Sequence, residues 1–260
     1  NHASIVDGCL TSGAKFLRFR HNDMEALEQR LQQVPDGVTK LIVADSVFSM
    51  DGDIIDFPRV VALARRYNAW LMIDEAHSVG VLGKTGRGVE EHFNMPGSID
   101  IKMGTLSKTI PSVGGYVAGK KDLIEYLRHA SRAYIFSAAL PPAQAAAAKA
   151  AFEVILEESW RVEKLNRNAS QFITGLKERG FDTLYSETAI VPVMLYDARR
   201  ASQVADAMLD EGIYVIGFSF PVVPQGRARI RVQISAAHER EHLDRAVTAF
   251  AKVGRDLDII

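Results

Sequence analysis

Three residues with side chains suited to acid–base and covalent chemistry lie in the middle of the chain. Asp74 and His77 follow an apolar run, and Lys108 lies farther along, next to hydroxyl residues that include Thr105 and Ser107. A lone lysine just beyond a strand is usually a solvated surface residue. A lysine amine can also form an imine with a carbonyl group, and small hydroxyl side chains beside it can hold an anion such as phosphate. The residues around Lys108 are therefore compatible with either interpretation.

Short apolar runs precede these residues and predict the strands that position them. The predicted elements alternate along the chain as helix 24–34, strand 40–44, helix 58–67, strand 69–73 and strand 99–103, followed by strand 114–119. Such alternation is typical of an α/β fold with a mainly parallel sheet flanked by helices. Ser46, Asp74 and Lys108 each follow a predicted strand, and ligands bind at the carboxyl ends of parallel strands. This shared position indicates a functional site.

Asp74, His77 and Lys108 together fit the requirements of pyridoxal 5'-phosphate. That cofactor needs a lysine for an imine and an anionic partner that keeps its pyridine nitrogen protonated, so that the ring can accept electrons. It also needs a partner for its phenolic oxygen and donors for its phosphate. Taken separately, Asp74 could cap a turn and His77 could be an ordinary loop histidine. At neighbouring strand ends they predict a pyridoxal phosphate site.

Five motifs then resemble successive motifs of one enzyme family. They are Asn1-His2-Ala3-Ser4-Ile5, Val47-Phe48-Ser49-Met50-Asp51-Gly52, Asp74-Glu75-Ala76-His77, Gly104-Thr105-Leu106-Ser107-Lys108 and Arg229-Ile230-Arg231. In this order they are similar to motifs of the α-oxoamine synthases, which are pyridoxal phosphate enzymes of fold type I that join an amino acid to an acyl-CoA. The resemblance covers essentially the whole chain. It implies a pyridoxal phosphate-dependent acyltransferase, and it implies that family members carry further chain before the Asn-His motif.

The resemblance assigns a role to each residue that contacts the cofactor ring. Lys108 is implied to form the imine and to remove the α-proton of the amino acid. Asp74 pairs with the pyridine nitrogen, and His77, helped by Ser49, contacts the phenolic oxygen. His2 is implied to lie over the face of the ring.

Further residues are implied to hold the phosphate and the substrate. Thr105 and Ser107 hold the phosphate, and Ser137 contacts a phosphate from the neighbouring subunit. The chain has Ala138 and Ala139 where relatives often carry another hydroxyl. Arg231 grips the substrate carboxylate, a task suited to a bidentate guanidinium.

The domain organisation follows from the helical pattern beyond Pro141-Pro142. We expect a cofactor-binding large domain over 1–155 with its N-terminal part missing, because the chain starts without Met or a signal peptide. A long helix over 156–180 is expected to bridge to a small α+β domain over 181–260. Within the small domain we predict strand 190–196, helix 201–211, strands 214–216 and 228–234, and helix 242–253.

The resemblance also bears on substrates and partners. Residues 211–238 are most similar to glycine C-acetyltransferase (2-amino-3-ketobutyrate CoA ligase), which implies glycine and acetyl-CoA as substrates and release of CoA. Residues 74–93 and 104–116 are more similar to serine palmitoyltransferase-type members, and 8-amino-7-oxononanoate synthase is the other alternative. A homodimer with its active site at the interface is implied. The expected location is cytoplasmic, with a mitochondrial location left open.

Composition excludes other classes. With 31 basic and 32 acidic residues, the chain has no charge excess that would indicate nucleic acid as a partner. No apolar run approaches the roughly 20 residues that a membrane span requires. His238-Glu239-Arg240-Glu241-His242 matches the zinc metalloprotease signature, but its surroundings are charged. An inactive scaffold subunit would be expected to lose Lys108, so we predict an enzyme without a metal.

Overall fold

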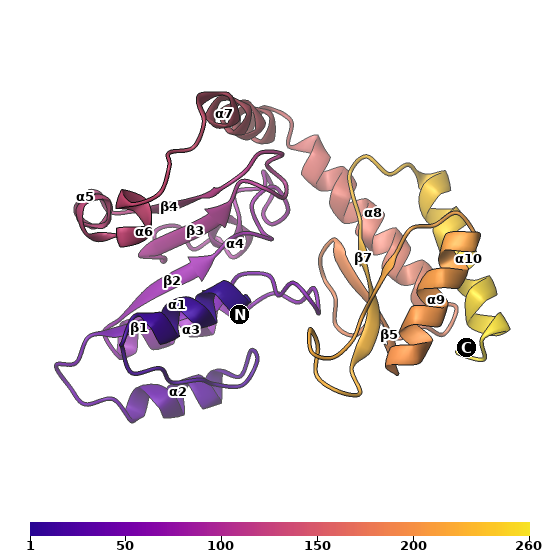
Figure 1. Cartoon of the computed structure of the whole chain (residues 1–260), viewed down its shortest axis with the longest axis horizontal. Helices are drawn as coiled ribbons and strands as arrows, with labels where there is room; N and C mark the ends of the chain where they lie inside the picture. Colours follow the sequence, from indigo (N-terminus) through magenta and orange to yellow (C-terminus); the bar gives the residue numbers. More distant parts are fainter. The chain divides into compact units, whose positions relative to one another are not determined.

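The computed structural model describes residues 1–260 and separates into two compact units (Figure 1). Unit 1 comprises Asn1–Val47 and Ile54–Ser159. Unit 2 comprises Trp160–Ile260 and the short segment Phe48–Asp53, which comes from within the N-terminal part of the chain. None of the helices is both long enough and apolar enough to span a membrane.

Unit 1 is built on a four-stranded sheet with the order β1-β2-β3-β4. Its strands are β1 (Lys40–Asp45), β2 (Ala69–Asp74), β3 (Ile101–Thr105) and β4 (Gly115–Gly119). The first three are parallel, and β4 pairs antiparallel with β3. In register, Asp74 lies opposite Asp45 on one side and Met103 on the other. The predicted mainly parallel α/β fold is confirmed, and the three parallel strands end at one edge.

Helices flank this sheet and complete unit 1. They are α1 (Ala3–Thr11), α2 (Met24–Gln32), α3 (Phe57–Arg66), α4 (Val89–His92), α5 (Lys121–Ala130), α6 (Arg132–Ile135) and α7 (Pro142–Glu157). Helix α3 packs against β2, and Phe57 and Val60 of the helix are completely buried, as is Ile73 of the strand. Burial of such side chains is the main favourable contribution to folding. Helices α1, α4, α5 and α6 were not predicted from the sequence.

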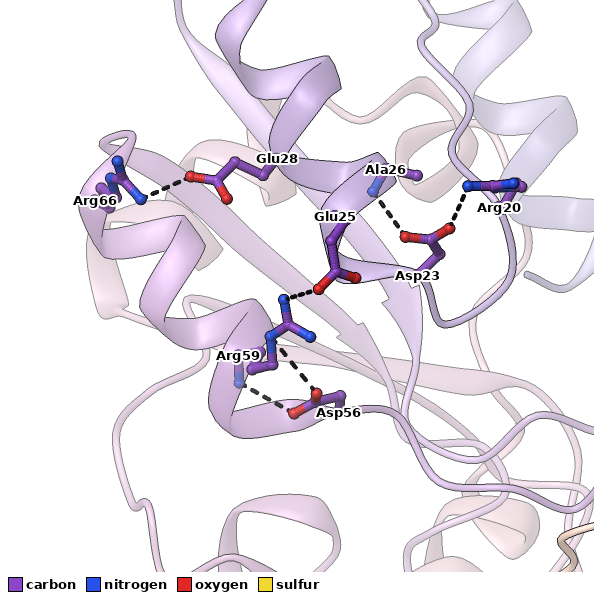
Figure 2. Close-up of polar contacts among 8 residues, drawn as sticks. All are labelled: Arg20, Asp23, Glu25, Ala26, Glu28, Asp56, Arg59 and Arg66. Atoms are coloured by element: carbon purple, nitrogen blue, oxygen red, sulfur yellow. Dashed lines mark hydrogen bonds and ion pairs between the residues drawn. The ribbon is translucent and has the colours of Figure 1, made fainter.

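Helix α2 begins where the sequence predicted, and charged side chains join it to α3 (Figure 2). The Asp23 carboxylate accepts a hydrogen bond from the Ala26 backbone N–H at 2.8 Å and so caps α2. Arg59 of α3 contacts Glu25 of α2 at 2.7 Å. A second pair between these helices joins Arg66 to Glu28, also at 2.7 Å. Because solvent screens exposed ion pairs, these contacts add little stability compared with the apolar face of α2.

The long helix predicted over 156–180 is in fact interrupted. Helix α7 ends at Glu157, and α8 (Trp160–Lys177) begins three residues later. Glu158 has φ −117° and ψ 53°, which lie outside the helical region. The apolar pattern continues across the interruption, so periodicity alone could not reveal it. Ser159, a residue type favoured at helix N-termini, was the available local signal.

Unit 2 contains a three-stranded antiparallel sheet and three helices. The strands β5 (Ile190–Tyr196), β6 (Ile216–Phe218) and β7 (Ala228–Gln233) have the order β5-β7-β6. The helices are α8, α9 (Ala198–Asp210) and α10 (Arg240–Asp256). Phe172 and Phe181 each pack edge-on against Phe250, at ring separations of 6.2 and 5.9 Å. Strand β6 begins at Ile216, where the strand predicted over 214–216 was expected to end.

Candidate functional site

A pocket of about 800 Å³ lies in unit 1 at the carboxyl ends of β2 and β3. The wall includes side chains from β4, α5 and α6, because β4 returns alongside β3 and leads into these helices. Five of the residues singled out from the sequence line this pocket, namely His2, Asp74, Thr105, Ser107 and Lys108. Of the three residues expected to converge after predicted strands, Asp74 and Lys108 line the pocket, whereas Ser46 does not and instead donates to the Asp74 carbonyl.

Lys108 and His77 meet beside the pocket. The Lys108 Nζ atom lies 3.0 Å from His77 Nε2. If the ammonium group donates, Nε2 must be the unprotonated nitrogen of a neutral imidazole, with the proton on Nδ1. The contact therefore also provides a path for a proton between the amine and the imidazole.

The loop that carries Lys108 is held by the residues on either side of it. Leu106 and Ile110 are buried in an apolar cluster with Ala148 of α7. The Leu106 N–H donates to the Gly114 carbonyl at 2.9 Å and closes the base of the loop. Since the apolar residues at both ends point inward, Lys108 and its neighbours Ser107 and Thr109 are exposed. The pattern Leu-Ser-Lys-Thr-Ile thus directs the amine outward.

Asp74 ends β2 and is only 5% exposed, although it lines the pocket. Its Oδ1 atom accepts a hydrogen bond from the Ala76 N–H at 2.8 Å. Its backbone carbonyl accepts from both the N–H and the hydroxyl of Ser46, at 2.9 and 2.7 Å. Asp74 thus caps the turn after β2 and also lines the pocket, whereas its implied pairing with a pyridine nitrogen stays a prediction. A buried carboxylate fixed in this way can hold a cationic ring nitrogen.

Thr105 and Ser107 place two hydroxyl groups next to each other on the pocket wall. Their oxygens are 2.8 Å apart, and the Ser107 N–H donates to Thr105 Oγ1 at 3.3 Å. Hydroxyl groups can rotate to donate to an incoming anion. The pair can therefore receive a phosphate oxygen, and the phosphate-holding role implied for these two residues stays a prediction.

His2 is tied to the sheet by its backbone. Its N–H donates to Asp45 Oδ1 at 3.4 Å, and its ring nitrogen Nδ1 accepts from the Ser4 N–H at the start of α1. Burial raises the pKa of Asp45, and the negative charge of nearby Asp74 raises it further. The carboxyl ends of β1 and β2 thus bring two buried acids close together.

Four of the sequence-predicted site residues do not line the pocket, namely His77, which contacts Lys108 beside it, and three others. Ser137 belongs to unit 1 and is exposed, whereas Ser49 and Arg231 belong to unit 2. Within unit 2, Arg231 donates to the Ser49 carbonyl at 3.1 Å and lies over the ring of Phe218 at 4.8 Å. Burial lowers the pKa of Arg231. The implied roles of these three residues toward cofactor and substrate stay predictions.

Arg229, the first arginine of the Arg-Ile-Arg motif, has a different environment. It is 2% exposed and donates to the Met50 carbonyl at 3.0 Å and to the Asp51 carboxylate. It therefore fastens the segment Phe48–Asp53 to β7. Alternation along a strand places Arg229 and Arg231 on the same face. This two-residue alternation was the only signal in the sequence that Arg229 faces the same segment as Arg231.

Sequence reasoning missed two residues at the site, the buried Glu75 and the partly buried Tyr116, which lines the pocket. Glu75 is 3% exposed, and its carboxylate accepts from the Ser78 hydroxyl and from the Val89 N–H. Burial raises its pKa. Tyr116 lies opposite Gly104 in the sheet, and a side chain on Gly104 would meet its ring at 2.5 Å. Burial, and then the charges of Glu75 and Asp74, raise the pKa of Tyr116.

In the zinc metalloprotease signature, Glu239 and His242 cap helix α10, and His238 accepts a hydrogen bond in the preceding turn. His238 precedes α10, and its Nδ1 accepts from the Ser235 N–H at 3.2 Å. His242 Nδ1 accepts from the Glu239 N–H at 3.1 Å, and the Glu239 carboxylate pairs with Lys164 at 2.6 Å. A zinc site of this class needs both histidines on one helix and a free glutamate. The structure has neither.

The residues around the pocket fit pyridoxal phosphate. They provide a lysine amine, an imidazole next to it, a buried carboxylate and a pair of hydroxyl groups. The carboxylate oxygen Oδ1 of Asp74 already has a backbone partner, which leaves Oδ2 for a ring nitrogen. A volume of about 800 Å³ is also within the range of small-molecule sites.

Comparisons with known proteins give a consistent result. Residues 1–250 match the family described as Aminotransferase class I and II. The 8-amino-7-oxononanoate synthase of Thermosipho melanesiensis is 48% identical over 260 residues, which cover 100% of this chain and 66% of that protein. The chain thus spans slightly less than two thirds of that relative. Other curated relatives, 42–48% identical, carry the same name.

Solved structures that are similar to this chain include serine palmitoyltransferase from S. paucimobilis with a bound pyridoxal phosphate–myriocin adduct. It has a TM-score of 0.96 at 38% identity, and the match covers 100% of this chain and 66% of that one. The 8-amino-7-oxononanoate synthase from Francisella tularensis has a TM-score of 0.82 at 28% identity, with 100% and 74% covered. The particular similarity to glycine C-acetyltransferase predicted from residues 211–238 is not confirmed by these relatives.

Proposed function

Since the chain belongs to the α-oxoamine synthases, within the class I and II aminotransferase family, we propose that it is a pyridoxal phosphate-dependent acyltransferase. The proposed reaction joins the α-carbon of an amino acid to the acyl group of an acyl-CoA and releases CoA. The observation that carries this proposal is the 3.0 Å contact of Lys108 with His77 beside the pocket that Asp74 lines.

Pyridoxal phosphate, when bound, supplies an electron sink that lowers the pKa of the amino acid's α-carbon. Asp74 would hold the ring nitrogen in its protonated form, because a buried carboxylate favours a cationic partner. Thr105 and Ser107 would donate hydrogen bonds to the phosphate, and His2 would cover one face of the ring.

Lys108 has two tasks in this scheme. Its amine would attach the cofactor and, once released, would accept the proton from the α-carbon of the amino acid. His77 holds Nζ in place and can share that proton through Nε2. The Ser49 hydroxyl would help His77 at the phenolic oxygen. Arg231 would bind the carboxylate of the amino acid with the donors that Ser49 does not use.

Borohydride reduction tests the role of Lys108 directly. The protein incubated with pyridoxal phosphate should gain a stable adduct on Lys108 after reduction, detected by mass spectrometry of peptides. Lys108→Ala should lose both the adduct and CoA release, whereas Lys102→Ala should keep the adduct, because Lys102 pairs with Glu90. An adduct of equal yield in Lys108→Ala would contradict the proposal.

The name of the relatives' product, combined with the proposed bond between an α-carbon and an acyl carbon, supports a proposal for the substrates. In an 8-amino-7-oxononanoate, the carbonyl carbon is C7 and the carbon that carries nitrogen is C8. The new bond is therefore C7–C8. Carbons C1 to C7 come from a seven-carbon dicarboxylic acyl thioester, and C8 and C9 come from alanine, whose carboxyl group leaves as carbon dioxide. We propose these substrates because relatives with this product are up to 48% identical to the chain.

A second candidate is the condensation of serine with palmitoyl-CoA. The higher TM-score of the serine palmitoyltransferase structure, 0.96 against 0.82, favours it. CoA release measured with alanine, serine and glycine against seven-carbon dicarboxylic, palmitoyl and acetyl thioesters distinguishes the candidates. Preference for alanine with the dicarboxylic thioester supports the first candidate. Preference for serine with palmitoyl-CoA, or for glycine with acetyl-CoA, contradicts it.

We further propose that a second copy of the chain covers the segment around Ser137, making a homodimer. Large apolar side chains in this segment are exposed, including Tyr134 at 62% and Phe136 at 74%. Clusters of exposed apolar side chains usually mark interfaces. The Ser137 hydroxyl would then reach the phosphate site of the partner.

Phe136→Asp tests this interface, since a charge in the middle of an apolar contact opposes association. Light scattering should give a dimer for the unchanged protein and a monomer for Phe136→Asp. Tyr185→Asp is the matched control, because Tyr185 is 88% exposed but belongs to unit 2. A dimer that persists in Phe136→Asp would contradict the proposed interface.

A further inference from the structure

Glu75 is a buried carboxylate for which the proposed chemistry has no use. It directly follows Asp74, is 3% exposed and does not line the pocket. Its neighbour Lys102 pairs instead with Glu90, at 2.5 Å. Because burial of a charge is costly unless hydrogen bonds compensate it, the contacts of Glu75 should reveal its role.

Glu75 lies in the middle of a chain of buried hydrogen bonds. Its carboxylate accepts from the Ser78 hydroxyl, and the Ser78 oxygen lies 2.9 Å from the hydroxyl of Ser46. Ser46 in turn lies 2.7 Å from the Asp74 carbonyl through its hydroxyl and 2.9 Å through its N–H. Ser46 and Ser78 are fully buried. The chain thus connects Glu75 to the backbone of Asp74 without contact with solvent.

The direction of these hydrogen bonds depends on Glu75. Each serine hydroxyl has one proton to donate, whereas an ionised carboxylate only accepts. With Glu75 as acceptor, the Ser78 proton points to the carboxylate, and the Ser78 oxygen is left to accept from Ser46, whose single proton is shared between Ser78 at 2.9 Å and the Asp74 carbonyl at 2.7 Å. Without that acceptor, the Ser78 hydroxyl is left with the Glu75 backbone carbonyl at 3.1 Å, and the orientation in which its oxygen accepts from Ser46 is no longer fixed by the carboxylate.

Glu75 also holds the end of loop 80–88, which contains four glycines, against the same strand end. Its carboxylate accepts from the Val89 N–H at 3.2 Å. Gly88 has φ +95°, and a side chain there would lie 2.5 Å from the Glu75 carboxylate. Only glycine allows so close an approach in this conformation. The Glu75 side chain therefore joins the strand end that carries Asp74 to the loop that leads into α4.

We propose that Glu75 is a positioning residue that fixes Asp74 for the ring nitrogen of pyridoxal phosphate through Ser78 and Ser46. It touches neither cofactor nor substrate. Its effect is to hold the Asp74 backbone, and hence the carboxylate, in one orientation. This inference rests on the proposed function.

The test compares four variants of the whole protein. Glu75→Ala removes the central acceptor, and Ser78→Ala breaks the same chain with a smaller change in a buried site. Glu75→Gln keeps an acceptor oxygen for Val89 and can rescue the network. Glu91→Ala is the matched control, because Glu91 accepts from Thr85 at 2.7 Å and from the Arg87 N–H at 3.0 Å in the same loop.

Two readouts separate positioning from stability. Amide hydrogen exchange without cofactor should accelerate at Ser46 and Val89 in Glu75→Ala, and at Thr85 and Arg87 in Glu91→Ala. The Kd for pyridoxal phosphate, measured by fluorescence on folded protein, should rise about tenfold in Glu75→Ala, as expected for loss of one hydrogen bond to a charged group. It should rise in Ser78→Ala as well, but stay near the unchanged value in Glu75→Gln and Glu91→Ala.

Other outcomes overturn the inference. An unchanged Kd in both Glu75→Ala and Ser78→Ala would show that the network does not position Asp74. So would an equal rise in Glu91→Ala, since loop anchorage alone would then explain the effect. If the unchanged protein bound no pyridoxal phosphate, the proposed function itself would fail, and the exchange data would still report whether the network exists.

Discussion

Gly80 supports the loop that carries Lys108, and its replacement by alanine should disturb that loop. Gly80 has φ +77°, and a Cβ atom there would lie 2.2 Å from Thr109 Cγ2 and 3.2 Å from Thr109 Cβ. Gly97 is a matched control with φ +75° and no heavy atom within 4 Å of the added Cβ. The two substitutions thus share the backbone cost and differ in the contact.

The expected loss of stability is the sum of a backbone cost and a steric cost. A left-handed conformation costs an alanine about 1–2 kcal/mol relative to glycine, and this applies to both positions. Overpacking adds typically about 1–3 kcal/mol, and this applies only to Gly80→Ala. We therefore expect Gly80→Ala to lower the free energy of unfolding by about 1–3 kcal/mol more than Gly97→Ala. Because the displaced residue is next to Lys108, CoA release should also fall in Gly80→Ala alone.

Urea denaturation of five proteins measures the effect, namely the unchanged protein, Gly80→Ala, Gly97→Ala, Thr109→Ser and the double variant Gly80→Ala/Thr109→Ser. Serine lacks the Cγ2 atom that the new Cβ would strike, so Gly80→Ala should cost less in the Thr109→Ser background. The resulting double-mutant cycle isolates the contact, because residues in contact do not behave additively. Equal costs for Gly80→Ala and Gly97→Ala, or no relief from Thr109→Ser, would refute the reasoning.

Three further predictions concern charged residues. Arg229→Ala should destabilise unit 2 by about 3 kcal/mol, because it leaves the Asp51 carboxylate without its buried partner; a loss below about 1 kcal/mol in urea denaturation would contradict this. Arg231→Ala, on the same strand face, should instead raise the KM for the amino acid while leaving the KM for the acyl-CoA nearly unchanged, and equal changes in both would argue against carboxylate binding. Burial raises the pKa of Glu75 in the folded protein above the ordinary value of 4.5 that applies to the unfolded chain. At a pH between the unfolded and the folded pKa, the folded protein therefore retains a proton that the unfolded chain has lost. Stability should therefore fall as pH rises through this window, by about 1.4 kcal/mol per unit of pKa shift, and the fall should disappear in Glu75→Gln. A pH-independent difference between the two proteins would contradict the raised pKa.

Local patterns in the sequence were sufficient for the sheet and for much of the site. Apolar runs placed β1 and β2 within a residue of their observed ends, because buried parallel strands are apolar on both faces. The positions of Asp74 and Lys108 after successive strands predicted that they would meet at one edge. The type of each residue then indicated the chemistry, since a lysine, a carboxylate and hydroxyl groups match the needs of one cofactor.

Other features depend on contacts between residues far apart in the chain, so no local pattern could reveal them. Glu75 is one example, because its role comes from hydrogen bonds to Ser78 and Val89 and from the absence of a side chain at Gly88. The interruption between α7 and α8 is another, since periodicity continues across it.

The sequence by itself determined the order of elements, the identity of the reactive side chains and the family that they resemble. Tertiary structure decided which of those side chains share a pocket, that Lys108 Nζ meets His77 Nε2, and that Arg229 is structural whereas Arg231 keeps free donors. The physical reason is the range of the interactions. Periodicity and capping act over one or two turns of chain, whereas hydrogen bonds and burial depend on the folded arrangement of distant segments.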